Sequence, residues 1–195
     1  MKNTLLFALG LIAVAMVVFA TEPADAQTTS TGPYYATPAW DQKLQCDTLA
    51  TCPRFVLLSN WNNAAVLDRE TGLVWEQSVD TTFRNFHDSQ VFCNNRATGG
   101  RRGWRLPTIQ ELSSLTDPTR NFPSLPAGHP FGGLAFPQPG AWSASISIAA
   151  PAFAPSSTSN AWFIEFQHGL ADIDVQSDSF GATWCVRGGQ GVDPQ

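Results

Sequence analysis

The chain has 195 residues, a net charge of −5 and many aromatic residues, among them seven Trp and thirteen Phe. Aromatic residues at this density favour a folded domain over disorder. The mild negative charge gives no indication of general binding to nucleic acids or membrane surfaces.

The first 26 residues have the three-part form of a secretory signal peptide. Lys2 precedes an apolar run over residues 5–20, and Ala24-Asp25-Ala26 supplies a cleavage site with small residues. A membrane anchor is disfavoured, because a spanning helix needs about 20 apolar residues. We therefore expect export, cleavage after Ala26 and no membrane span in the mature chain. What remains is enough for one domain, which would bury roughly two-thirds of its unfolded surface.

Four Cys in an exported protein indicate two disulfides, and three pairings are open. Cys46 and Cys52 can close a small loop within an N-terminal arm expected over residues 27–53. That pairing leaves Cys93 with Cys185. The second bridge would close a long loop and stabilise the fold by about 4 kcal/mol in the chain-entropy model.

A hairpin is predicted near the start of the domain. Strand candidates cover residues 54–58, 64–67 and 73–76. A polar loop over 59–63 separates the first two, and a turn over 68–72, closed by Gly, separates the last two.

A helix is predicted next, capped by Thr81 or Thr82 and running to about Asn94. Phe83, Phe86, Gln90 and Cys93 recur there at helical spacing. A loop rich in Gly and Arg follows over residues 95–103.

The run Trp104-Arg105-Leu106-Pro107-Thr108 leads into a second, short helix. Thr108 and Glu111 form a capping box, in which each side chain accepts a hydrogen bond from a backbone N–H of the first turn. The helix is expected to end near Asp117-Pro118. Residues 117–140 then predict a long irregular loop, and residues 143–160 a surface segment of low complexity.

A late hairpin is predicted over residues 161–176, with His168-Gly169 as a two-residue turn. This register pairs Ile164 with Ile173 and places Glu165 directly across from Asp172. One face is then wholly apolar and is assigned to the core. The other members of that face are Trp162, Phe166, Ala171 and Val175. A final strand is expected over residues 182–187.

These motifs resemble, in their order, the Lcl C-terminal-like domain family of bacterial exported domains. The matching runs are Val66-Leu67-Asp68, Thr71-Gly72-Leu73-Val74-Trp75-Glu76, Gly103-Trp104-Arg105-Leu106-Pro107-Thr108, Trp142-Ser143-Ala144-Ser145 and Cys185-Val186-Arg187-Gly188. The resemblance covers about residues 54–189 and leaves 190–195 as a tail. It implies an α+β, C-type-lectin-like fold with two helices, small antiparallel sheets, long irregular loops and a disulfide from the first helix to the last strand. It also implies a binding or adhesive role, because the founding member's domain attaches to host glycosaminoglycans.

The chain departs from calcium-dependent lectins. Gln138-Pro139-Gly140 is only a fragment of their sugar-binding tripeptide, and no Trp-Asn-Asp triplet follows it. Calcium-bridged sugar binding is therefore not supported, and no cofactor is predicted. The Arg105–Thr108 element is also similar to formylglycine-generating enzymes, but their copper-binding cysteine pair is not apparent here.

Three arginines, Arg96, Arg101 and Arg102, are the first candidate ligand contacts, because guanidinium groups bind sulfate and carboxylate in bidentate fashion. The favoured alternative leaves them solvated and makes Arg105 a structural ion-pair partner. Trp61, in a loop rich in Asn, is the best candidate for an exposed aromatic contact. The indoles of Trp104, Trp142, Trp162 and Trp184 are expected mainly in the core.

A candidate metal site comprises Glu165, Asp172 and Asp174, whose oxygen ligands suit Ca²⁺. It rests on the predicted juxtaposition of Glu165 and Asp172, since like charges directly across a hairpin are destabilising. The favoured alternative directs both carboxylates into water. No catalytic motif is found, and no catalytic residue is predicted.

We therefore expect a secreted, periplasmic or surface-exposed binding module, without catalytic activity, for a glycan (sulfated glycans included) or a protein surface. Two alternatives stay open. One is an enzyme of the formylglycine-generating type. The other is a structural module of a cell-surface complex that forms homo-oligomers.

Overall fold

The structure is a computed structural model that describes residues 29–30, 53–134, 140–149, 159–179 and 181–188. The predicted signal peptide, the Cys46–Cys52 disulfide and the tail lie outside the described residues. Within the described part, no helix is long and apolar enough to cross a membrane.

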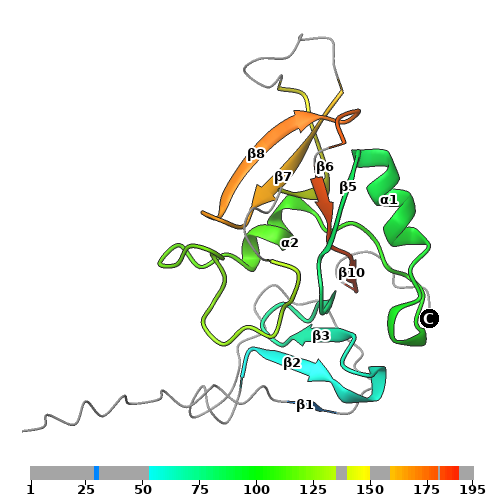
Figure 1. The fold of residues 1–195 in the computed structure, drawn as a ribbon, viewed down its shortest axis with the longest axis vertical. Helices are drawn as coiled ribbons and strands as arrows, with labels where there is room; N and C mark the ends of the chain where they lie inside the picture. The colour runs from blue at the N-terminus through cyan, green and yellow to red at the C-terminus, as the bar shows by residue number, and fades with distance from the viewer. Residues whose placement is uncertain (1–28, 31–52, 135–139, 150–158, 180, 189–195) are drawn as a thin grey trace, which may run out of the picture.

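The described residues form an α+β fold with two five-stranded sheets and two α-helices (Figure 1). The first sheet has the order β1 (Thr29–Ser30), β2 (Phe55–Leu58), β3 (Ala65–Asp68), β4 (Val74–Glu76) and β10 (Val186–Arg187). The second has the order β5 (Asp80–Arg84), β9 (Gly181–Thr183), β6 (Ala141–Ser147), β7 (Asn160–Glu165) and β8 (Leu170–Val175). The helices are α1 (Phe86–Asn94) and α2 (Ile109–Ser114), with 3-10 turns at Ser59–Trp61 and Thr98–Gly100. Both sheets are mixed, because β1 runs parallel to β2 and β6 to β9, so the prediction of purely antiparallel sheets is wrong.

The first sheet is buried on both faces, which explains why β2 is a continuous apolar run. Phe55 and Leu57 belong to one hydrophobic cluster, together with Trp75 and Trp184. Val56 and Leu58 point the other way, into a second cluster around the two cysteines of the disulfide. Alternate side chains of one short strand thus link the two cores.

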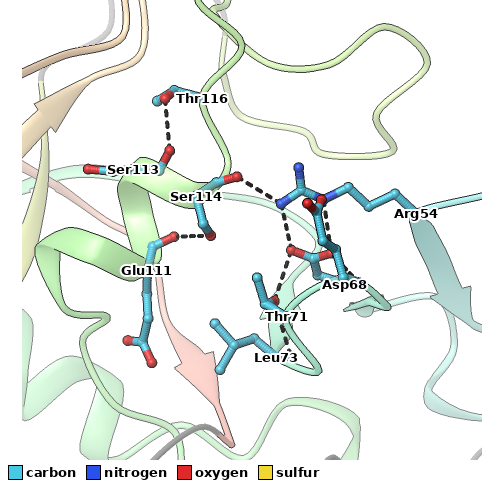
Figure 2. Close-up of polar contacts among 9 residues, drawn as sticks. Arg54, Asp68, Thr71, Leu73, Glu111, Ser113, Ser114 and Thr116 are labelled. Atoms are coloured by element: carbon cyan, nitrogen blue, oxygen red, sulfur yellow. Dashed lines mark hydrogen bonds and ion pairs between the residues drawn. The ribbon is translucent and has the colours of Figure 1, made fainter. Parts of the chain in front are cut away.

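The predicted hairpin over residues 64–76 is confirmed, and an arginine ties its turn to α2 (Figure 2). Arg54 Nε and Nη2 donate to the two oxygens of the buried Asp68 at 3.0 and 2.9 Å, and Nη2 also donates to the Ser114 carbonyl at 2.8 Å. Burial disfavours the guanidinium charge, but the hydrogen bond to Asp68 and the charges of Asp68 and Glu70 outweigh it, so the pKa of Arg54 is raised. The contact keeps α2 beside the hairpin turn.

The predicted first helix begins later than expected. Thr81 and Thr82 lie in β5, which pairs with β9, and the actual N-cap is Asn85, whose side chain accepts from the Asp88 N–H at 2.8 Å. Local helical spacing included Phe83, but pairing with a distant strand decided the conformation of residues 80–84.

The structure also corrects the C-terminal half. Residues 141–147, placed in part in a segment of low complexity, form β6, the middle strand of the second sheet. Its small residues allow α2 to approach, as Ser145 Oγ accepts from the Ile109 N–H at 3.0 Å. The predicted final strand is split, so that β9 joins the second sheet and β10 the first. Trp184 and Cys185, which are fully buried, lie between them.

The late hairpin exists with another register. Ile164 pairs with Ala171 and Glu165 with Leu170, which leaves a four-residue turn in place of the predicted two. Phe166 leaves the strand to pack against Trp184, with ring centroids 5.4 Å apart. An offset of two residues keeps each side chain on its predicted face. The face is nevertheless only partly core, since Ile164 and Phe166 are buried, Trp162, Ile173 and Val175 are half-buried, and Ala171 is exposed.

The disulfide between Cys93 and Cys185 is confirmed and joins α1 to the segment before β10. The capping box is confirmed as well: Thr108 Oγ1 accepts from the Glu111 N–H at 3.2 Å, and Glu111 Oε2 accepts from the Thr108 N–H at 2.8 Å.

The long loop after α2 contains a half-buried histidine. The His129 imidazole stacks on Phe131 with centroids 6.0 Å apart, and its Nδ1 accepts from the Phe131 N–H at 3.3 Å. Burial, with a smaller contribution from the charge of Arg120, lowers the pKa of His129 below its usual 6.5. The neutral ring is therefore the form that this loop accommodates.

Candidate ligand-binding loop

The arginine-containing loop between α1 and Trp104, residues 95–103, is the first candidate site, and we call it the basic loop. A buried carboxylate anchors it. Glu76, at the end of β4, accepts from Arg96 Nε at 2.6 Å and from Thr98 Oγ1 at 2.5 Å. Arg96 also lies over the Phe92 ring, 4.9 Å from its centroid. Arg96 was predicted as a ligand contact, but its guanidinium is engaged in holding the loop.

Two tryptophans lie beneath the basic loop. Trp104 Nε1 donates to the carbonyls of Thr98 and Arg101, at 3.3 and 3.0 Å. Trp61 packs edge-on against Trp104, and Gly99, with φ of 65°, passes so close that a Cβ there would lie 2.5 Å from the Trp61 ring. This approach requires glycine both for its φ and for its lack of a side chain.

Trp61 was predicted as an exposed ligand contact, and this prediction is wrong, since only 4% of it is exposed. Its neighbours in sequence are polar, but the hydrophobic surface that covers it comes from the distant Trp104 and Gly99. Of the other tryptophans expected in the core, Trp104, Trp142 and Trp184 are buried, whereas Trp162 is half-buried.

The anchored loop presents Arg101 and Arg102 to solvent. Both are exposed, and neither forms an ion pair with a carboxylate of the described residues. The guanidinium of Arg101 lies 5.8 Å from the centroid of the Trp61 ring, and the carbonyl of Arg102 accepts from Arg187 Nε at 2.8 Å. Two neighbouring cations on an anchored backbone can bind an anionic group with little ordering cost.

Arg105 is a structural ion-pair partner, as predicted. Its Nη1 and Nη2 donate to the two carboxylate oxygens of Glu111 at 2.8 and 2.7 Å, and Nη2 also donates to the Gly188 carbonyl at 2.7 Å. The side chain is 32% exposed, so the pair is partly solvated.

The proposed metal ligands do not converge. In the observed register Asp172 lies across from Phe163 and Glu165 across from Leu170, so the predicted opposition of like charges is wrong. Glu165 contacts His168 Nδ1 at 3.1 Å instead. In the described ranges, no group of three or more His, Cys, Asp and Glu side chains is placed to hold a metal ion.

Asp172 and Asp174 have a different local role on β8, one of the two edge strands of its sheet. The Gln176 N–H donates toward β7, to the Ser159 carbonyl, so the N–H groups of residues 173 and 175 point away from the sheet. Asp172 accepts from the Ile173 N–H at 2.8 Å and Asp174 from the Val175 N–H at 2.7 Å. The two carboxylates thereby cap N–H groups that another strand would otherwise bind.

Sequence reasoning missed the role of Glu76. The available signal was a single acidic residue at the end of the apolar run Leu73-Val74-Trp75, which predicts a buried charge in need of a partner. Its partners are about 20 residues away in sequence, so no local pattern could identify them.

Comparison with known families matches residues 64–187 to the Lcl C-terminal domain. The matched region extends from the start of the β3–β4 hairpin to β10, and so includes the basic loop, the capping box and the disulfide. No curated protein matches the chain.

Proposed function

We propose that this chain, which belongs to the Lcl C-terminal domain family, is an exported binding module without catalytic activity that recognises glycans carrying acidic groups. In this proposal the domain has a C-type-lectin-like fold, and the basic loop contacts sulfate or carboxylate groups of the glycan. Contact through guanidinium groups requires no bridging metal ion.

The observation that carries the proposal is the arrangement of Arg101 and Arg102. Other arginines, such as Arg54 and Arg105, are bound to carboxylates. Arg101 and Arg102 are exposed side by side on a backbone that Glu76, Trp61 and Trp104 hold in place. Binding therefore costs mainly the ordering of two side chains.

The test is binding to a glycan array that includes sulfated polysaccharides, with and without a chelator. We expect binding to sulfated glycans that the chelator leaves unchanged and that weakens as salt is raised. Replacing Arg101 and Arg102 together with Gln should weaken it about tenfold or more, since charge-assisted hydrogen bonds contribute about 1.5–3 kcal/mol each before solvent screening. Absence of binding to any glycan would refute the proposal.

Arg120→Gln is the matched control. Arg120 is also exposed and also forms no ion pair with a described carboxylate, but it lies on the loop after α2 and not on the basic loop. An equal loss of affinity in this variant would show that the basic loop is not the specific contact.

The enzyme alternative needs a free reactive thiol. Cys93 and Cys185 are bonded to each other. A thiol count on the unreduced protein tests the remaining pair, Cys46 and Cys52, and full oxidation of all four would exclude that alternative.

A further inference from the structure

An exposed phenylalanine is held in a costly backbone conformation on the loop after α2. Phe122 has a φ of 51°, in the left-handed region, and is 55% exposed. A bulky residue adopts this conformation only at an energetic cost, and such strain persists only where surrounding contacts impose it. The residue is not a glycine, which would adopt this φ without strain, and its ring is too exposed for burial to compensate the strain.

The surrounding contacts come from the turn of the β7–β8 hairpin. The Phe122 N–H donates to the Gln167 carbonyl at 2.9 Å, and the Ser124 N–H donates to the Phe166 carbonyl at 2.7 Å. The Ser124 hydroxyl, which is fully buried, donates to the same carbonyl at 3.0 Å. Hydrogen bonds on both sides of the strained residue therefore hold its backbone against the hairpin turn.

The phenyl ring forms a corner with an imidazole. The Phe122 and His168 rings are 5.1 Å apart and inclined by 76°. Glu165 Oε1 lies 3.1 Å from His168 Nδ1, which orients the imidazole, and no hydrogen bond within the described part involves its Nε2. His168 and Glu165 have side-chain exposures of 47% and 30%, so hydrogen-bonding groups border the exposed ring.

We propose that this corner of Phe122, His168 and Glu165 is a second subsite, which binds an uncharged pyranose ring. The C–H face of the sugar lies on the phenyl ring, while its hydroxyls bond to imidazole Nε2 and the carboxylate, both of which serve as acceptors. A single rigid aromatic ring beside planar polar groups matches a ligand that is apolar on one face and polar at its edge. A purely apolar partner would leave those polar groups unpaired.

This subsite deepens the proposed function and rests on it, because a glycan that reaches both places would present acidic groups to the basic loop and a sugar face to Phe122. The two contributions differ physically. Contacts at the basic loop weaken with salt, whereas stacking on Phe122 does not.

The experiment is a titration of the ¹⁵N-labelled protein with neutral disaccharides of glucose, galactose and N-acetylglucosamine, followed by amide chemical shifts. We expect saturable shifts at residues 121–124 and 165–169 that persist in 0.5 M NaCl. Phe122→Ala should raise the dissociation constant at least tenfold, whereas Phe122→Trp should retain binding. Phe83→Ala, on β5, is the matched control, since Phe83 is 60% exposed and should be neutral.

The outcomes distinguish a failure of the second subsite alone from a failure of both proposals. If sulfated glycans bind but the neutral disaccharides cause no shifts at these amides, the second subsite is overturned and the basic loop is still supported. Shifts that Phe122→Ala leaves unchanged would have the same consequence. Neutral-sugar shifts that survive in the Arg101→Gln/Arg102→Gln variant would establish it independently of the basic loop. Absence of binding to neutral and sulfated glycans alike would overturn both. The spectrum of each variant shows whether it is folded.

Discussion

Replacing Cys93 and Cys185 together with alanine should lower the free energy of unfolding by about 4–5 kcal/mol. The bonded residues are 92 positions apart. In the chain-entropy model a loop of that length restricts the unfolded chain by about 4.6 kcal/mol at 25 °C. The native state should change little, because both residues are fully buried and alanine fits where cysteine was.

The assay is urea unfolding followed by tryptophan fluorescence, which is well suited to a core that contains Trp75, Trp104, Trp142 and Trp184. In the variant, the slope of the free energy of unfolding against urea concentration should be steeper, because an unfolded chain without the cross-link exposes more surface. A loss of 5 kcal/mol approaches the whole stability of many domains. Both proteins should therefore be compared in the same concentration of a stabilising osmolyte.

The same substitution at Cys46 and Cys52 provides a comparison. These residues are six positions apart, so a disulfide between them should contribute only about 2 kcal/mol. If removal of the Cys93–Cys185 bridge cost less than about 2 kcal/mol with an unchanged slope, restriction of the unfolded state would not be how the bridge acts.

Three further predictions concern the basic loop, the sheet edge and pH. Arg96→Gln leaves the buried Glu76 without a charge partner and should lower the free energy of unfolding, measured in urea, by about 2–3 kcal/mol. This loss is smaller than the roughly 3–5 kcal/mol expected for breaking a fully buried pair, because Arg96 is 39% exposed. Replacing Asp172 and Asp174 with alanine uncaps two outward N–H groups of β8 and should increase self-association in light scattering relative to the wild type. The pKa of His129 is lower in the folded protein than in the unfolded chain, so below about pH 6.5 the unfolded chain binds more protons than the folded protein. The stability that the neutral His129 ring contributes is therefore complete above that pH and is lost as the pH falls through the pKa of the folded state. Urea unfolding at pH 7.5 and at pH 5.5 should show a lower free energy of unfolding at the lower pH.

Each of these has a control. The double variant Glu76→Gln/Arg96→Gln should recover part of the lost stability, and no recovery would argue against a buried unpaired charge. Asp178→Ala removes an exposed acid beyond β8 and should not promote association. His129→Gln should flatten the pH dependence, and an unchanged slope would assign it to other groups.

Local patterns predicted several elements correctly because their causes lie within a few residues. The capping box is one example, since Thr108 and Glu111 satisfy each other's backbone N–H groups. The turn between β3 and β4 is another, closed by Gly72 with a φ of 73°. The hairpin around residue 168 was found, but its register was not, because burial of Phe166 against the distant Trp184 lengthened the turn.

The candidate site was predicted less well than the fold. The sequence located the arginine cluster, yet Arg96 proved to be an anchor and Trp61 a buried support. Both outcomes depend on partners that are far away in sequence, Glu76 in one case and Trp104 in the other.

By itself, the sequence determined the motifs that identify the family, the position of the second helix and the loop that carries the arginines, since short-range hydrogen bonds and residue types decide these. Only the tertiary structure decided which arginines remain available, that β5 is a strand, and that Asp172 and Asp174 cap a sheet edge. The physical reason is that burial and ion pairing depend on contacts between segments that are far apart in sequence. The periodicity of residues within one segment does not indicate which distant segment it will contact.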